Sequence, residues 1–175
     1  FQPDVQYRGF VASPVVGVPQ GLAVYQNGVR VNEVFGDTVN WDFIPDYAIH
    51  RLDVLPNNPI FGLNALGGAI SIDMKNGFNY QGREVELRAG SFWRRSAMAQ
   101  VGMQEGNTSF YVGADAINDN GWRQRSPSQL RRIYSDVGVT GEGSEFHLNF
   151  TGASNFFGAT ATTPIQMLNQ NWSAV

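Results

Sequence analysis

The side chains that most often do chemistry in proteins are sparse in this sequence. The two histidines, His50 and His147, are isolated and lack the spacing of a metal site or a catalytic triad. The glycines at 62–68 have neither the lysine nor the following helix of a phosphate-binding loop. A G-x-S-x-G context is missing around Ser13, Ser71 and Ser91. The sequence therefore predicts no catalytic residue, no metal site and no cofactor.

Residues that could bind a ligand gather in the segment 32–43. This segment contains Phe35, Asn40, Trp41 and Asp42, so aromatic and polar groups lie close together, as they do in ligand pockets. The alternative is that Phe35 and Trp41 only pack the core of the first half of the chain. Both interpretations stay open from the sequence.

The composition favours a β-rich protein. The chain has 175 residues, enough for one domain or parts of two. Charged residues make up 15%, against about 25% in soluble domains, whereas glycine (20 residues) and aromatic residues (13%) are abundant. No stretch approaches the roughly 18 continuous apolar residues of a membrane helix. The absence of cysteine excludes a disulfide framework, and a net charge of −3 argues against nucleic-acid binding.

The elements expected in the first half of the chain are short and separated by turns. Asn27-Gly28 between two apolar runs is the strongest short signal for a β-hairpin. A short helical or turn segment should end near residue 48, and strands are expected at 49–55 and 69–74. Pro56-Asn57-Asn58-Pro59 breaks the first of these strands. This half therefore predicts a compact unit of mixed α+β structure.

From about residue 83 the pattern changes to long alternation of apolar and polar residues. Five segments of about nine to eleven residues result, the length of a tilted strand that crosses a bilayer. Tight connections at 105–107 and 141–143 contrast with a long polar connection at 118–132, as in outer-membrane barrels. A soluble antiparallel β-sandwich is the alternative, but frequent alanines on the apolar side favour the barrel.

Several motifs, taken in order, resemble the TonB-dependent receptors of Gram-negative outer membranes. Arg8-Gly9-Phe10 and AVYQNGVR (23–30) look like elements of the plug of that family. The strand IHRLDVL (49–55) looks like the family's IERIEV strand, and FGLNALGGAISI (61–72) resembles the end of its plug. DNGWR (119–123) resembles a further common element after the third barrel strand.

The resemblance implies a fragment of a plugged transmembrane β-barrel of about 22 strands. Residues 1–78 would be the C-terminal part of a small mixed α+β plug, and residues 79–175 the first strands and loops of the all-β barrel. The chain departs from the family pattern at Pro56-Asn57-Asn58-Pro59, where Arg-Gly-Pro is usual, and at Asp53, where glutamate is usual.

The function implied by the resemblance is import of a scarce nutrient across the outer membrane, without enzymatic activity. A ferric siderophore is the default substrate, while vitamin B12, haem, sugars and other metals stay open. The implied partners are TonB, through an N-terminal segment that this chain does not contain, and the lipid and lipopolysaccharide of the outer membrane.

The resemblance also suggests roles for charged residues. If the apolar residues of the alternating segments face lipid, their polar neighbours line the interface between plug and barrel. These neighbours are Glu86, Arg88, Gln100, Asp115, Asp136, Glu145, His147 and Asn149. Arg8 and Arg51 of the plug would pair with barrel carboxylates and hold the plug in place. The alternative for both is an ordinary exposed or strand-edge arginine.

A basic segment follows the third expected barrel strand. We place it in an outer loop, where Trp122 and Arg123 are candidates to bind an anionic substrate. The other cations of this loop would be Arg125, Arg131 and Arg132. The alternative is that the loop binds the phosphates of lipopolysaccharide.

Overall fold

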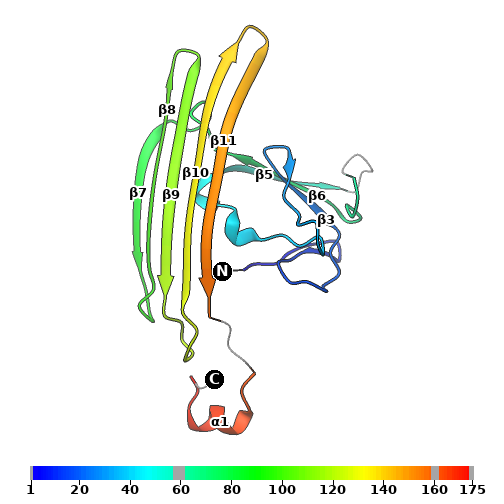
Figure 1. Ribbon diagram of the computed structural model, residues 1–175, viewed down its shortest axis with the longest axis vertical. Coiled ribbons are helices and arrows are strands. Elements are labelled where there is room, and N and C mark those ends of the chain that lie inside the picture. The colour runs from blue at the N-terminus through cyan, green and yellow to red at the C-terminus, as the bar shows by residue number, and fades with distance from the viewer. Residues whose placement is uncertain (1, 57–61, 159–161, 174–175) are drawn as a thin grey trace.

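The computed structural model describes residues 2–56, 62–158 and 162–173. It contains a five-stranded sheet (the long sheet), a four-stranded sheet (the small sheet) and a separate two-stranded pair. The small sheet lies beside one face of the long sheet (Figure 1). The break predicted at Asn57-Asn58-Pro59 lies outside the described residues.

The small sheet combines a hairpin with a long-range parallel pairing. Its strands are β3 (Leu22–Gln26), β4 (Val29–Arg30), β5 (Ile49–Pro56) and β6 (Gly68–Met74), in the order β4-β3-β6-β5. Asn27 and Gly28 form the predicted turn, and both have positive φ (48° and 78°), as a type I′ turn requires. The hairpin and the strands expected at 49–55 and 69–74 are thus confirmed. The parallel pairing of β6 with β3 places the second half of this unit against its first.

The N-terminal unit consists of the small sheet and the short elements that precede and connect its strands. β1 (Val5–Tyr7) pairs with β2 (Phe10–Ala12), and two 3₁₀ helices precede β5, η1 (Trp41–Phe43) and η2 (Asp46–Ala48). These helices are the helical segment expected to end near residue 48. η1 lies against β11 of the long sheet, so this segment connects the two sheets in space.

The long sheet is an antiparallel meander whose strands lie in chain order. They are β7 (Gly82–Ala89), β8 (Arg95–Glu105), β9 (Thr108–Asp119), β10 (Ser128–Gly141) and β11 (Ser144–Phe157). The two-residue turns 106–107 and 142–143 lie at one end, and the connections 90–94 and 120–127 lie at the other (Figure 1). β10 and β11 have 14 residues each, more than the roughly nine to eleven expected for a spanning strand. The alternation in β10 begins earlier than predicted, inside the stretch assigned to a loop.

The two faces of the long sheet differ in polarity and in exposure. The apolar face carries large side chains that are at least 61% exposed: Leu87, Phe146, Leu148 and Phe150. The polar face, toward the small sheet, carries the buried side chains of Gln100, Arg132 and Asp136. A one-sided soluble sheet buries its apolar face and solvates the polar one. The long sheet has the reverse arrangement.

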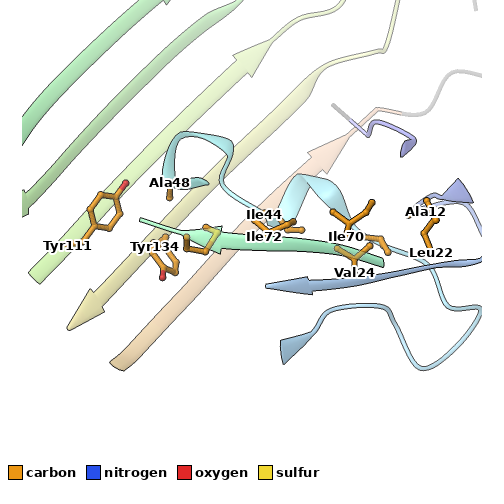
Figure 2. Packing of buried hydrophobic residues seen from close by; sticks show 11 residues of the cluster. Ala12, Leu22, Val24, Ile44, Ala48, Ile70, Ile72, Tyr111 and Tyr134 are labelled. Carbon is orange, nitrogen blue, oxygen red and sulfur yellow. The ribbon is translucent and has the colours of Figure 1, made fainter. Parts of the chain in front are cut away.

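The main hydrophobic core lies in the small sheet and reaches the long sheet. Its fully buried members include Leu22, Val24, Ile70 and Ile72. Burial of each such side chain contributes about 1.5–3 kcal/mol. Tyr111 of β9 and Tyr134 of β10 belong to the same cluster and extend it onto the polar face (Figure 2). The core therefore fixes the small sheet on the long one through two tyrosine rings.

The helix α1 (Ile165–Gln170) has six residues and follows β11, on the side of the longer connections (Figure 1). None of the helices in the described part of the chain is long and apolar enough to cross a membrane.

Candidate functional site

The best-developed polar site is the interface between the two sheets, and Arg132 is its centre. Arg132 lies on β10 and is 8% exposed. Its guanidinium contacts both carboxylate oxygens of Asp115 on β9, at 3.0 and 2.6 Å. It also donates to the carbonyl of Ile44 at 3.0 Å and to Asp46 Oδ1 at 2.5 Å. One long-sheet arginine therefore holds both the backbone and a side chain of the N-terminal unit.

Tyr47, between Asp46 and Ala48 in η2, makes a second contact across the interface. Its hydroxyl donates to the carbonyl of Gly113 on β9 at 2.7 Å. Burial raises the pKa of Tyr47 well above its ordinary value, and the negative charge of Asp115 raises it further. The phenol therefore stays protonated and remains a donor.

Lys75 makes the third contact, where the chain leaves the small sheet. Its ammonium donates to the carbonyl of Tyr47 at 2.7 Å and to Gln100 Oε1 at 3.0 Å. Burial lowers the pKa of Lys75, and the nearby charge of Glu84 opposes this effect. Gln100 in turn accepts from Tyr111 at 2.7 Å and donates to Glu84 at 2.7 Å. This network joins the exit of the N-terminal unit to three neighbouring strands of the long sheet.

Amide side chains form further bridges between the sheets. Asn27, at the tip of the β3–β4 hairpin, donates to the Tyr134 hydroxyl at 3.0 Å and accepts from the backbone of Met74 at 2.9 Å. Asn155 of β11 donates to Asp42 in η1. The polar contacts thus extend from β8 to β11.

His147 and two carboxylates form a cluster on β10 and β11. The Nδ1 of His147 lies 2.8 Å from Asp136 Oδ1, and its Nε2 lies 2.6 Å from Glu145 Oε1. An imidazole donates from both nitrogens only when it is protonated, so this geometry suits the imidazolium ion. No cluster of three or more possible metal ligands occurs within the described ranges.

The connection 120–127 packs on the segment that follows β11. The rings of Trp122 and Trp172 stack with centroids 5.6 Å apart and planes 3° apart. Arg123 lies over the Trp122 ring at 5.6 Å and donates to Thr163 at 2.7 Å. The backbone of Gln124 donates to the Ser173 carbonyl. Trp122 and Arg123 therefore belong to a cluster formed with the segment after β11.

The residues predicted for ligand binding in the segment 32–43 differ in how deeply their side chains are buried. Phe35 is 81% exposed and Asn40 donates to Glu33. The indole of Trp41 donates to the carbonyl of Ala12 at 2.9 Å, and its ring packs against the core. Asp42 is buried against β11. Trp41 therefore packs against the core, as the alternative interpretation predicted, whereas Phe35 does not.

The two arginines expected to pair with barrel carboxylates, Arg8 and Arg51, both make contacts within the N-terminal unit. Arg51 pairs with Asp53 at 3.0 Å and with Asp73 at 2.7 Å, both in the small sheet and not in the long one. Asp53 lies two residues further along β5, and the neighbouring strand β6 brings Asp73 opposite Arg51. Arg8 is exposed and lies over the ring of its neighbour Tyr7 at 5.2 Å, a contact within its own turn.

Arg132 is the residue that sequence reasoning misplaced. It was expected in an outer loop, but it lies in β10, and the ion pair between the sheets runs from long-sheet arginine to N-terminal carboxylate. Tyr134 and Asp136 alternate with apolar residues, and continuing this alternation back by two positions would have placed Arg132 on the polar face. Arg131, the adjacent residue, is exposed.

Three of the remaining interface candidates lie around one cavity between the sheets. Asp115, Glu86 and Arg88 line a cavity of about 330 Å³ together with Asp46 and Lys75. Glu86 and Arg88 also contact each other on β7. Asp136, by contrast, contacts His147 in the cluster described above.

The fold is a small sheet held by polar contacts on one face of a long antiparallel meander, and solved structures share it. The chain is similar to the ferric-catecholate import receptor Fiu from E. coli K12, with 16% identity in both forms. The open form matches with a TM-score of 0.64 over 85% of this chain and 22% of the receptor. The closed form matches with a TM-score of 0.62 over 82% and 20%.

The siderophore receptor PirA from Acinetobacter baumannii matches with a TM-score of 0.56 and 14% identity, over 85% of this chain and 26% of that receptor. The chain thus spans about a quarter or less of the solved receptors it resembles. These likenesses confirm the predicted resemblance to TonB-dependent receptors at the level of fold. No family model and no curated protein matches the sequence.

Proposed function

We propose that this chain is the junction between plug and barrel in a TonB-dependent receptor of a Gram-negative outer membrane. Residues 1–78 are the C-terminal part of the plug, and residues 79–175 are the first strands and loops of the barrel. The reversed polarity of the long sheet carries this proposal, because its polar face holds the small sheet and its apolar face is bare. Such faces suit a wall between lipid and a polar lumen.

In this proposal the interface keeps the plug in place until it is pulled. TonB acts on an N-terminal segment outside this chain, and bound substrate biases the plug toward release. The contacts of Arg132, Tyr47 and Lys75 are hydrogen bonds and ion pairs. The neutral Tyr47 bond contributes about 0.5–1.5 kcal/mol net, and each bond from the charged Arg132 and Lys75 about 1.5–3 kcal/mol. The interface therefore closes the lumen without making opening prohibitive.

We propose a ferric siderophore as substrate and no enzymatic activity. The similar solved proteins are named as a ferric-catecholate import receptor and a siderophore receptor. Trp122 and Arg123 offer an aromatic ring and a cation on the side of the long connections, which suits an aromatic anionic chelate. Phe35 is the most exposed candidate on the plug, and Asn40 lies in the same segment.

The membrane contacts follow from the same orientation. The apolar face meets the lipid chains, and Arg131, exposed near the end of β10 where the long connections lie, meets the phosphates of lipopolysaccharide. A soluble β-sandwich is the alternative, and it requires the Phe146-Leu148-Phe150 face to be a dry interior.

Single-cysteine variants distinguish the receptor from the soluble β-sandwich. Leu148→Cys lies on the apolar face and the neighbouring Asn149→Cys on the polar one, and the chain itself has no cysteine. In the full-length protein in native membranes, a lipid-soluble maleimide should label the Leu148→Cys variant strongly and the Asn149→Cys variant weakly. Weak labelling of Leu148→Cys, with the protein recovered in a soluble fraction, would exclude the receptor.

Substrate import is tested with the full-length protein and a ferric tris-catecholate. We expect binding of the ferric chelate and its uptake by iron-starved cells, with uptake but not binding lost when TonB is deleted. Uptake that persists without TonB would refute the proposed energy coupling.

A further inference from the structure

A cavity of about 310 Å³ lies between the η1–η2 segment and the ends of β9 and β10 nearest the long connections. One wall is apolar and includes Ile44, Ile117 and Leu130. Trp41 and Asp42 also line it. Ligand pockets span about 300–1,000 Å³, so this volume suits a side arm of a ligand and not a whole metal chelate.

Asp42 is a buried carboxylate with unused hydrogen-bonding capacity. The residue is 2% exposed, and one of its oxygens accepts from Asn155. Its other oxygen, Oδ1, is buried and has no hydrogen-bond partner among the described residues. A buried carboxylate oxygen without a donor is energetically unfavourable, so a donor that enters the cavity would gain a strong acceptor.

The cations near the cavity already have carboxylate partners. Arg132 contacts Asp115 and Asp46, and Arg94 lies 3.7 Å from Asp119. The cavity lining holds two carboxylates, Asp42 and Asp46, and two guanidinium ions, and beyond the lining Asp115 and Asp119 pair with those ions. The local excess of negative charge favours a cationic guest over an anionic one.

We infer that this cavity binds an alkylammonium group, with the ammonium on Asp42 and the stem against the apolar wall. A charged end on an apolar stem matches a carboxylate beside aliphatic side chains, and the indole of Trp41 favours a cation nearby. The inference rests on the proposed function in one respect, that the ammonium is an arm of the imported chelate.

The test uses the full-length protein and two probes that differ by one group, 5-amino-1-pentanol and 1,5-pentanediol. Saturation-transfer NMR measures their dissociation constants for the native protein, Asp42→Asn and Asp53→Asn. The last variant removes a carboxylate of the small sheet that pairs with Arg51. A charge-assisted hydrogen bond should make the amine bind about tenfold tighter than the diol in the native protein.

Asp42→Asn should abolish this preference for the amine, and Asp53→Asn should retain it. Equal binding of the two probes to the native protein would overturn the inference without any variant. A preference that survives Asp42→Asn would overturn it as well. Ferric tris-catecholate binding, measured on the same samples, separates the two proposals. If the chelate binds but the protein binds the amine and the diol equally well, the receptor function is supported and the ammonium site is refuted.

Discussion

Replacing Arg132 by methionine should loosen the docking of the N-terminal unit on the long sheet. The side chains of Arg132 and Asp115 are each 7% exposed, so the substitution leaves a buried carboxylate without its cation. Changes of this kind cost about 3–5 kcal/mol. The lower end applies here, because the adjoining cavity of about 330 Å³ lets water reach Asp115. The pair with Asp46 adds little, since that side chain is 80% exposed.

A loss of about 3 kcal/mol raises the population of the undocked state roughly a hundredfold. Hydrogen exchange with mass spectrometry on the full-length protein measures this population. The backbone amides of Ile44 and Ala48 donate within the η1–η2 segment and report on its release. Peptides covering 41–48 should exchange roughly a hundredfold faster in Arg132→Met, and peptides covering β3 should not change.

The adjacent Arg131 supplies the control. It is exposed on the opposite face, so Arg131→Met should alter exchange by no more than about twofold, as for surface substitutions. The double variant Arg132→Met/Asp115→Leu removes both charges and should restore slow exchange in large part. Native-like exchange of residues 41–48 in Arg132→Met would refute the assignment of Arg132 as the central contact.

Two further outcomes follow from the structure. A Cβ at Gly113 would lie 2.5 Å from the Tyr47 ring, so Gly113→Ala should weaken docking by about 1–3 kcal/mol and speed hydrogen exchange at residues 41–48. The control Gly90→Ala meets only an ordinary contact and should leave this exchange unchanged. Equal exchange in the two variants would contradict the tight approach of Gly113 to Tyr47. Trp122→Ala removes the stack of Trp122 on Trp172, which is worth about 0.5–1.5 kcal/mol. It should abolish the exciton signal of this pair in circular dichroism, and the control Trp93→Phe should retain it. An unchanged signal in Trp122→Ala would show that the stack does not form in solution.

The fold was predictable where its cause is local. The Asn27-Gly28 turn dictates its hairpin through positive φ, and alternation with a period of two identifies each strand of the long sheet. The parallel pairing of β3 with β6 was not predicted, because it joins residues more than 40 positions apart and no local pattern reports it. Strand ends were misjudged where polar residues such as Arg132 continue the alternation into a supposed loop.

The candidate site was predictable in part for the same reason. Asp115 and Gln100 fall on the polar face by alternation alone, and the structure places both at the interface. Their partners could not be named, because Tyr47 and Lys75 belong to irregular segments whose direction depends on tertiary packing. Arg51, for which the resemblance implied a barrel partner, pairs in this chain with Asp53 and Asp73 of its own sheet.

The polar character of the interface has a consequence for how temperature acts on it. Exposure of apolar surface raises the heat capacity, and exposure of polar surface lowers it. Separation of the sheets hydrates the groups around Arg132 and Gln100 as well as the rings of Tyr111 and Tyr134, so the two contributions oppose each other. Undocking then has a small heat-capacity change, whereas melting of the core around Leu22 and Ile70 has a large positive one. The free energy of undocking therefore varies almost linearly with temperature, whereas the free energy of unfolding of the small sheet follows a curve.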